Sequence, residues 1–254
     1  MGRIAAWLVL VVGCYGQMDG GAAYAEFLRW RAVPENARLS WEQAGERYLT
    51  RLKARGVGGE EAARTWRIIE ARDEAALYDP AYAGKPTFQT APNALLVEAV
   101  KNRRPGKALD VGMGQGRNAV FLAKSGWEVT GFDVSKVGLE AAGRAAKAAG
   151  VSVRAVLAAD EEFDFGTEQW DLIALIYPIE KRSVFRVRDG LRKGGLVVVE
   201  CTHTENSGAP FEYGTNELLR IFEGFRILKY EDVLGTHEWM GKELRLVRLI
   251  AEKQ

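Results

Sequence analysis

The feature that most limits the fold is a glycine-rich segment in the middle of the chain, LDVGMGQGRN at residues 109–118. The pattern predicts a strand over residues 107–111, a turn with three alternating glycines, and a helix over residues 117–125. Glycines are needed where backbone turns tightly or lies against a ligand, and the first N–H groups of the following helix are available to bind it. The segment therefore predicts a nucleotide-binding loop at the carboxyl edge of a parallel sheet.

Asp110, two residues before the first glycine, indicates which kind of nucleotide the loop binds. Dinucleotide folds show GxGxxG, in which the helix start holds a pyrophosphate, whereas here the third glycine comes one residue early. A carboxylate at this position repels a pyrophosphate but suits a cation. S-adenosylmethionine carries an ammonium and a sulfonium group and no phosphate, so the loop favours that cofactor over NAD. Arg117 either faces solvent or contacts an anionic acceptor.

The next two strand patterns also end in acids. Residues 127–133 predict a second strand that ends at Asp133, 23 residues after Asp110. An acid at this place can bind both ribose hydroxyls. Ser135 is expected to cap a helix that runs to about residue 149. A third strand over residues 152–157 is followed by Asp160, which either caps a turn or helix or binds the adenine amino group.

Together these motifs resemble the class I S-adenosylmethionine-dependent methyltransferases over roughly residues 91–253. The loop DVGMGQGRNAVFLA at residues 110–123 is most similar to small-molecule members, the tellurite-resistance and thiopurine methyltransferases. The resemblance implies S-adenosyl-L-methionine as cofactor and direct methyl transfer to a small-molecule thiol, soft anion or hydroxyl. The cofactor-binding residues that it implies are Asp110, Gly112, Gly114, Gly116, Asn118, Asp133, Val134, Ala159, Asp160 and Tyr177.

The strand patterns and the resemblance predict an α/β fold. We expect a Rossmann-like, seven-stranded, mostly parallel sheet with a C-terminal antiparallel hairpin, plus an N-terminal helical extension. The later strands are expected over residues 170–177, up to residue 200, and over residues 225–234 and 243–252, with a long hairpin loop at 235–241. The expected divisions are residues 1–25 as a leader, 26–91 as the helical extension and cap, and 92–254 as the methyltransferase domain.

Capping signals predict the helices of the extension and of the tail. Ser40 and Gln43 form a capping box for a helix over residues 41–55, and a helix over residues 60–77 stops before Pro80. The remaining helix starts are Pro92, as the first residue of a helix that reaches residue 104, and Thr215, as the cap of a helix over residues 216–223.

Two interpretations are open for three aromatic residues of the extension. Tyr78, Tyr82 and Phe88 either line the methyl-transfer pocket or pack the extension against the core.

The candidate catalytic residues are Tyr177, at the end of strand four, and His203, after strand five. Ligands of open α/β sheets bind at this edge. Methyl transfer depends mainly on approach geometry and desolvation, so no base is diagnostic, and His203 is otherwise an exposed loop histidine. Tyr177-Pro178 replaces the Asn/Asp-Pro-Pro-aromatic motif of aminomethylating relatives, which argues against amide and exocyclic amine acceptors.

Composition excludes several classes of protein and of site. The chain has 254 residues, 47% of them hydrophobic, and 35 basic against 34 acidic residues, so no broad basic face points to nucleic acid. Two cysteines give neither a disulfide framework nor a CxxC metal pair. Two histidines give no His-rich metal site.

The first 25 residues resemble a secretory leader, because Arg3 precedes an apolar run over residues 4–12 and then small residues. Residues 11–14 resemble a lipoprotein cleavage box with Cys14 as the acylated residue, and residues 23–25 offer an alternative A-x-A cleavage site. Membrane contact is expected only through that lipid anchor. Export to the cell envelope conflicts with the cytosolic supply of S-adenosylmethionine, and the alternative is a cytosolic N-terminal helix.

Two other functions stay open. One is a NAD(P)-dependent oxidoreductase on a related fold, against which the early third glycine and Asp110 argue. The other is an exported nucleotide-binding protein without catalytic activity.

Overall fold

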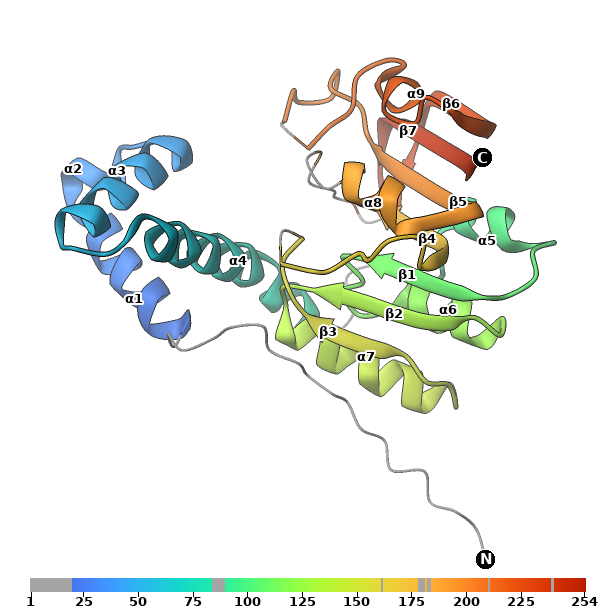
Figure 1. Cartoon of the computed structure of the whole chain (residues 1–254), viewed down its shortest axis with the longest axis horizontal. Helices are drawn as coiled ribbons and strands as arrows, with labels where there is room; N and C mark the ends of the chain where they lie inside the picture. Colours follow the sequence, from blue (N-terminus) through green and yellow to red (C-terminus); the bar gives the residue numbers. More distant parts are fainter. Residues whose placement is uncertain are drawn as a thin grey trace, which may run out of the picture.

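The structure is a computed structural model that describes residues 20–83, 90–160, 162–177, 181, 184–209, 211–238 and 240–254. Figure 1 shows a sheet domain from which a group of helices projects on the long helix α4 (Gly59–Ala83). The predicted leader up to residue 19, with Cys14, lies outside the described residues, as do Phe88 and Pro178. Within the described residues no helix is both long enough and apolar enough to cross a membrane.

Seven strands of the described chain form one sheet in the order β3-β2-β1-β4-β5-β7-β6. Neighbours from β3 to β5 run parallel, and β7 pairs antiparallel with both β5 and β6. This arrangement confirms the predicted fold class. The strands are β1 (Lys107–Val111), β2 (Glu128–Asp133), β3 (Arg154–Leu157), β4 (Trp170–Ile176), β5 (Leu191–Thr202), β6 (Phe225–His237) and β7 (Lys242–Lys253).

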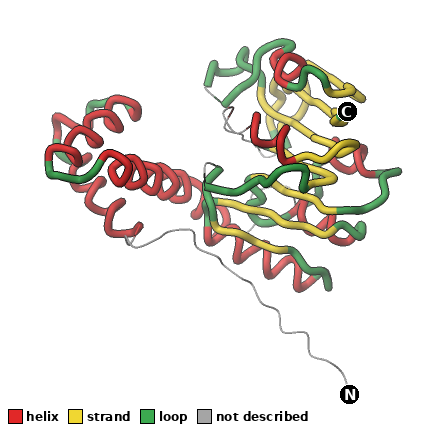
Figure 2. The backbone as a smooth tube through the Cα atoms, viewed as in Figure 1, coloured by secondary structure: helices red, strands yellow, loops and turns green. Residues whose placement is uncertain are grey.

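Helices cover both faces of the sheet (Figure 2), which is why its central strands are apolar on both sides. One core lies between the sheet and α5 (Ala94–Val100), α6 (Arg117–Lys124) and α7 (Lys136–Ala148). The other lies against α8 (Val184–Gly190) and α9 (Glu217–Ile221). Packing on both faces holds the parallel strands side by side, so their carboxyl ends lie together at one edge of the sheet.

The extension has a hydrophobic core of its own. It contains α1 (Gly20–Arg31), α2 (Pro34–Ala37), α3 (Trp41–Ala54) and most of α4. Phe27 is fully buried there, with ring centroids of Trp30, Trp41, Tyr48 and Trp66 within 5.8 Å of its own. Helix α1 therefore spans the expected division at residue 25.

The predicted stop of α4 before Pro80 is wrong, because the helix continues to Ala83. A proline inside a helix removes the hydrogen bond to the carbonyl four residues earlier. Here Ala76 and Pro80 are both exposed, so water can take that carbonyl. Packing of the last turn against the sheet domain then outweighs the local signal.

Two predicted helix starts are also corrected. Asn93, and not Pro92, is the N-cap of α5, since its Oδ1 accepts from the N–H of Leu96 at 3.1 Å and the helix begins at Ala94. Thr215 does not cap α9; its hydroxyl donates to Asp232 at 3.1 Å. In each case a tertiary contact or a better cap displaces the sequence signal.

The hairpin prediction is confirmed, with one change of length. β6 continues to His237, so only a short turn joins it to β7. His237 therefore lies within the β6–β7 ladder, paired with Lys242.

The burial of Phe27 leads to a test of whether α1 belongs to the core of the extension. Phe27→Ala is expected to lower the free energy of unfolding of the extension by about 3–5 kcal/mol, because it leaves a cavity among four aromatic rings. Urea unfolding followed by tryptophan fluorescence measures this. The matched control is Leu28→Ala on the same helix, 45% exposed, which should change the value by about 0.5 kcal/mol or less. Equal effects of the two variants would mean that α1 is not part of the core.

Candidate functional site

The predicted loop lies between β1 and α6 with its three glycines in the left-handed region. The φ angles of Gly112, Gly114 and Gly116 are 62°, 50° and 80°, values that favour glycine over residues with a Cβ. A Cβ at Gly116 would lie 2.8 Å from the Cβ of Ala142, so this glycine also lets α7 pack against the loop. The loop thus exposes backbone at the carboxyl edge of β1.

Asp110 places a buried carboxylate under this loop. It is 2% exposed, and among the described residues its Oδ2 has no hydrogen-bond partner. Burial raises the pKa of Asp110 to about 7, although the charge of Arg117 and the N–H of Ala119 oppose the shift. A buried acceptor without a partner is costly, and it marks a place where a cationic or N–H-bearing ligand group gains most.

Asp133, at the end of β2, links the glycine loop that follows β1 to the neighbouring strand. Its Oδ2 accepts from the N–H of Gly114 and its Oδ1 from the N–H of Ser135, both at 2.8 Å. Burial raises the pKa of Asp133 to about 6, while these two N–H groups act in the opposite direction. Sequence reasoning assigned this acid to a ribose and missed its part in shaping the loop. Ser135 caps α7 as predicted, accepting from the N–H of Gly138.

The end of α4 lies on the loop. Figure 1 shows α4 reaching the edge toward which the arrows of β1 and β2 point. A Cβ at Gly114 would lie 2.6 Å from the hydroxyl of Tyr82, and the hydroxyl of Ser135 donates to Asp79. Burial, with the charges of Glu74 and Asp133, raises the pKa of Tyr78 to about 12. Tyr78 and Tyr82 therefore lie next to candidate cofactor residues, an arrangement that fits both of their interpretations.

The remaining candidates for the cofactor end of the site are distributed as follows. Val134 and Asp160 are half-buried and Ala159 is buried, and the carbonyl of Asp160 accepts from Arg186 at 2.6 Å. Asn118 is buried and its Oδ1 accepts from the N–H of Asn93 at 2.9 Å. Its amide oxygen thus joins α6 to the start of α5.

Tyr177, directly after β4, has a left-handed backbone and donates its hydroxyl to Glu200. Its ring centroid lies 4.1 Å from that of His237. Burial and the charge of Glu200 hold the pKa of Tyr177 far above its usual range. The tyrosine is therefore a neutral aromatic side chain at the carboxyl end of β4.

Glu200 belongs to a buried polar network that sequence reasoning missed. It is 1% exposed, and besides Tyr177 it accepts from Arg248 Nε at 2.6 Å and from Asn93 Nδ2 at 3.0 Å. Its only sequence signal was a charged residue inside an apolar strand pattern.

His203 is buried within a network of its own. Its Nδ1 accepts from the N–H of Glu205 and its Nε2 lies 3.0 Å from Thr215 Oγ1, which donates to Asp232. These contacts fit the tautomer protonated on Nε2. The expectation of an exposed loop histidine is wrong, and both ring nitrogens are engaged in fastening the end of β5.

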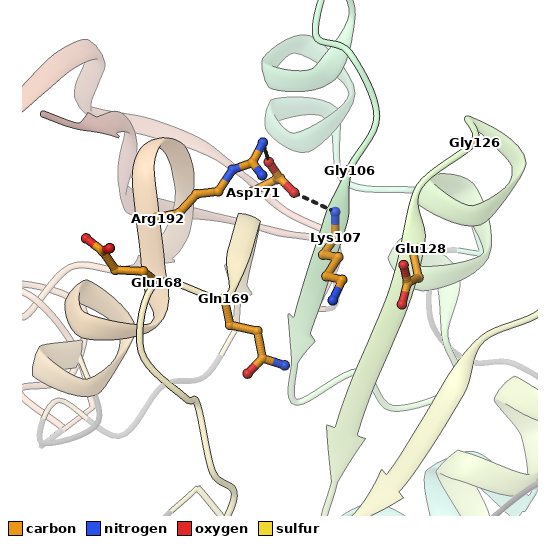
Figure 3. Close-up of a pocket in the computed structure, with 8 residues that line it drawn as sticks. All are labelled: Gly106, Lys107, Gly126, Glu128, Glu168, Gln169, Asp171 and Arg192. Carbon is orange, nitrogen blue, oxygen red and sulfur yellow. Dashed lines mark hydrogen bonds and ion pairs between the residues drawn. The ribbon is translucent and has the colours of Figure 1, made fainter.

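A cavity of about 440 Å³ opens at the opposite edge of the sheet, as Figure 3 shows. There Asp171 accepts from the N–H of Lys107 at 2.8 Å and pairs with Arg192. Ligands of such sheets bind outside the carboxyl ends of the strands, so this amino-edge cavity is separate from the candidate site. Its lining residues are Gly106, Lys107, Gly126, Glu128, Glu168, Gln169, Asp171 and Arg192.

Comparison with known proteins gives one matching family model and several relatives. Residues 108–195 match a model described as a methyltransferase domain. The chain is 26% identical over 188 residues to hemagglutinin 1 of Eikenella corrodens, covering 68% of this chain and 63% of that protein. It is 25% identical over 165 residues to the probable S-adenosyl-L-methionine-dependent methyltransferase TehB of Haemophilus influenzae, covering 61% of this chain and 58% of TehB.

The chain thus spans a little under two thirds of the length of these relatives. The crystal structure of TehB from Haemophilus influenzae has a TM-score of 0.58 at 21% identity, covering 69% of this chain and 67% of that one. At this identity the likeness shows a shared fold.

The buried carboxylate generates a pH-dependent prediction. Because the pKa of Asp110 is raised from 3.8 to about 7, its ionised form destabilises the folded state above pH 7, and this cost disappears as the pH falls toward 4. Asp110→Asn removes the charge and keeps an acceptor for the N–H of Ala119. It is expected to stabilise the protein by on the order of 2 kcal/mol at pH 8 and little at pH 4.5.

Thermal unfolding at both pH values checks this, with the exposed Asp164→Asn as control. An Asp110→Asn variant that is less stable than wild type at pH 8 would contradict the assignment of a strained, buried charge.

The matched segment runs from Ala108 in β1 to Gly195 in β5, so it contains the loop, Asp110 and Asp133. The sheet order and the left-handed glycines agree with it. On these grounds residues 108–195 carry a methyltransferase domain, and the chain resembles the class I S-adenosylmethionine-dependent methyltransferases, TehB among them.

Proposed function

We propose that this protein transfers the methyl group of S-adenosylmethionine to a small-molecule acceptor. The observation that carries the proposal is the buried Oδ2 of Asp110, which has no hydrogen-bond partner among the described residues and lies under a loop of left-handed glycines. The cofactor's ammonium group would satisfy that acceptor and offset the cost of burying the carboxylate.

The other assigned residues would hold the rest of the cofactor. Asp133 would bind the ribose hydroxyls with the lone pairs that Gly114 and Ser135 leave, since a carboxylate has about four acceptor positions. Ala159 and Asp160 would meet the adenine, and Tyr82 would cover the loop from the side of the extension. When bound, the cofactor supplies a methyl carbon activated by a sulfonium group.

The acceptor side supports a reaction without a protein base. Tyr177 keeps its proton because its hydroxyl donates to Glu200, and His203 has both ring nitrogens engaged. We therefore assign to Tyr177 the role of shaping the approach to the methyl group and excluding water. Thiolates and soft anions carry no proton that must be removed, so this arrangement favours them over hydroxyl acceptors.

The two alternative functions differ from the proposal in what they bind. A NAD(P)-dependent oxidoreductase binds NADH, whereas the family match and Asp110 both disfavour a pyrophosphate. An exported binding protein without catalytic activity that has kept the fold gives no heat when S-adenosylmethionine is titrated. The near balance of 35 basic and 34 acidic residues supports a small molecule rather than nucleic acid as acceptor.

Calorimetric titration with S-adenosylhomocysteine tests the cofactor assignment. Asp133→Ala should weaken binding by about 1–3 kcal/mol, the usual loss for hydrogen bonds to a charged group. Asp133→Asn, which keeps one acceptor oxygen for the loop, separates loss of the ligand contact from loss of the loop. The control is Asp189→Ala, exposed at the end of α8. Unchanged affinity in Asp133→Ala would remove the ribose assignment, and tight NADH binding would favour the oxidoreductase.

A methyl-transfer screen tests the acceptor class. Cofactor labelled in the methyl group is incubated with thiols, selenite, tellurite and small phenols, and volatile or extractable products are counted. We expect thiols or the soft anions to be methylated and Tyr177→Phe to retain activity, since it keeps the ring. Transfer to phenols alone, abolished in Tyr177→Phe, would contradict the base-free arrangement.

A further inference from the structure

Arg117 and Asn118 are the first two residues of α6 and directly follow Gly116, the last glycine of the loop. The first turn of a helix leaves N–H groups without partners inside the helix, and a ligand of the loop can reach these groups. A cation in this turn is opposed by the positive end of the helix dipole, and the turn holds no acidic residue. The side chain of Arg117 therefore depends on a partner from elsewhere in the fold.

That partner is Glu238, in the turn between β6 and β7. Arg117 Nη1 donates to Glu238 Oε2 at 2.8 Å and to the carbonyl of Ala91 at 3.1 Å. The side chains of Arg117 and Glu238 are only 15% and 14% exposed, so solvent and salt screen the pair weakly. The guanidinium is fixed against the hairpin and does not extend into water, so the solvent-facing interpretation of Arg117 is wrong.

A second route joins Glu238 to the same turn of α6. Glu238 Oε2 also accepts from Asn93 Nδ2 at 3.0 Å, and the N–H of Asn93 donates to Asn118 Oδ1 at 2.9 Å. Asn93 is fully buried, and Asn118 is 6% exposed. The other carboxylate oxygen of Glu238 accepts from the N–H of Ala94 at 3.2 Å. One carboxylate of the C-terminal hairpin thus holds, directly or through Asn93, the side chains of both residues that follow the glycine loop.

The turn that carries Glu238 is held independently of that carboxylate. The N–H groups of Gly241 and Met240 donate to the carbonyl and to Nδ1 of His237, at 2.8 and 3.2 Å. His237 is buried, and its ring lies against that of Tyr177 with 4.1 Å between the centroids. Replacement of Glu238 should therefore leave the hairpin in place and remove only its contacts with α5 and α6.

We propose that Glu238 is a positioning residue for the cofactor: through Arg117 and Asn93 it holds the first turn of α6 against the C-terminal hairpin and so fixes the backbone that follows the glycine loop. The inference rests on the proposed function, because it takes this loop to be the cofactor site. Glu238 touches neither the cofactor nor the acceptor in this role. A displaced turn changes the distance and angle of each hydrogen bond that its N–H groups make to the ligand, so the expected effect is on affinity.

Calorimetric titration with S-adenosylhomocysteine tests the proposal. Glu238→Ala should weaken binding about tenfold, the lower end of the usual loss for a hydrogen bond to a charged group. Glu238→Gln keeps the size of the side chain and one oxygen, so it should give a smaller loss in the same direction. The control is Glu243→Ala, exposed on β7 of the same hairpin, which should bind as the wild type does. Affinity is measured well below the unfolding temperature of each variant, because a merely stabilising contact lowers that temperature and leaves the affinity of the folded protein unchanged.

A double-variant cycle shows whether Glu238 acts through Arg117. If it does, Arg117→Met also weakens binding, and the double variant loses less affinity than the product of the two single losses. Losses that multiply would mean that the two residues act separately and would overturn the inference, as would unchanged affinity in the variants at Glu238. If the wild-type protein binds no S-adenosylhomocysteine, the proposed function itself fails.

Discussion

Asp110 places a carboxylate at the end of β1 between two strands that offer it only Gly131 and Ala174. Taking such a group out of water costs several kcal/mol unless charges or donors nearby compensate for it. The fold supplies a partial compensation through the N–H of Ala119 and the charge of Arg117, and leaves Oδ2 without a partner among the described residues. The glycine loop, the first turn of α6 and the position of Asp133 are all arranged around this under-satisfied carboxylate.

Segments from the N-terminal extension and from the C-terminal hairpin both contact residues around the glycine loop. From the N-terminal side, α4 brings Asp79 and Tyr82 onto the loop and the cap of α7. From the C-terminal side, the β6–β7 turn brings Glu238 to Arg117 and Asn93. Both segments lie outside residues 108–195, the part that matches the family model.

The sequence predicted the central elements well because their signals are local and agree with one another. Alternating glycines, apolar strand patterns and the Ser135 cap all point to one arrangement, and the structure has it. The failures have a common cause in contacts between distant parts of the chain. Pro80 predicted the end of α4, but the last turn of the helix is stabilised by the hydrogen bond from Ser135 to Asp79. Thr215 was predicted to cap a helix, but its hydroxyl donates to Asp232 instead. His203 looked exposed because two of its partners, Thr215 and Asp232, lie 12 and 29 residues further along the chain.

Short motifs and their spacing are enough to predict the α/β fold, the loop, the two acids that follow it and the kind of cofactor. The surroundings of that loop, in contrast, depend on contacts made in the folded protein. The pairing of Tyr177 with Glu200, of Arg117 with Glu238, and of Tyr82 with Gly114 joins residues from 23 to 121 positions apart. No local pattern encodes such contacts, because they arise when strand order and helix packing bring buried charges within reach of one another.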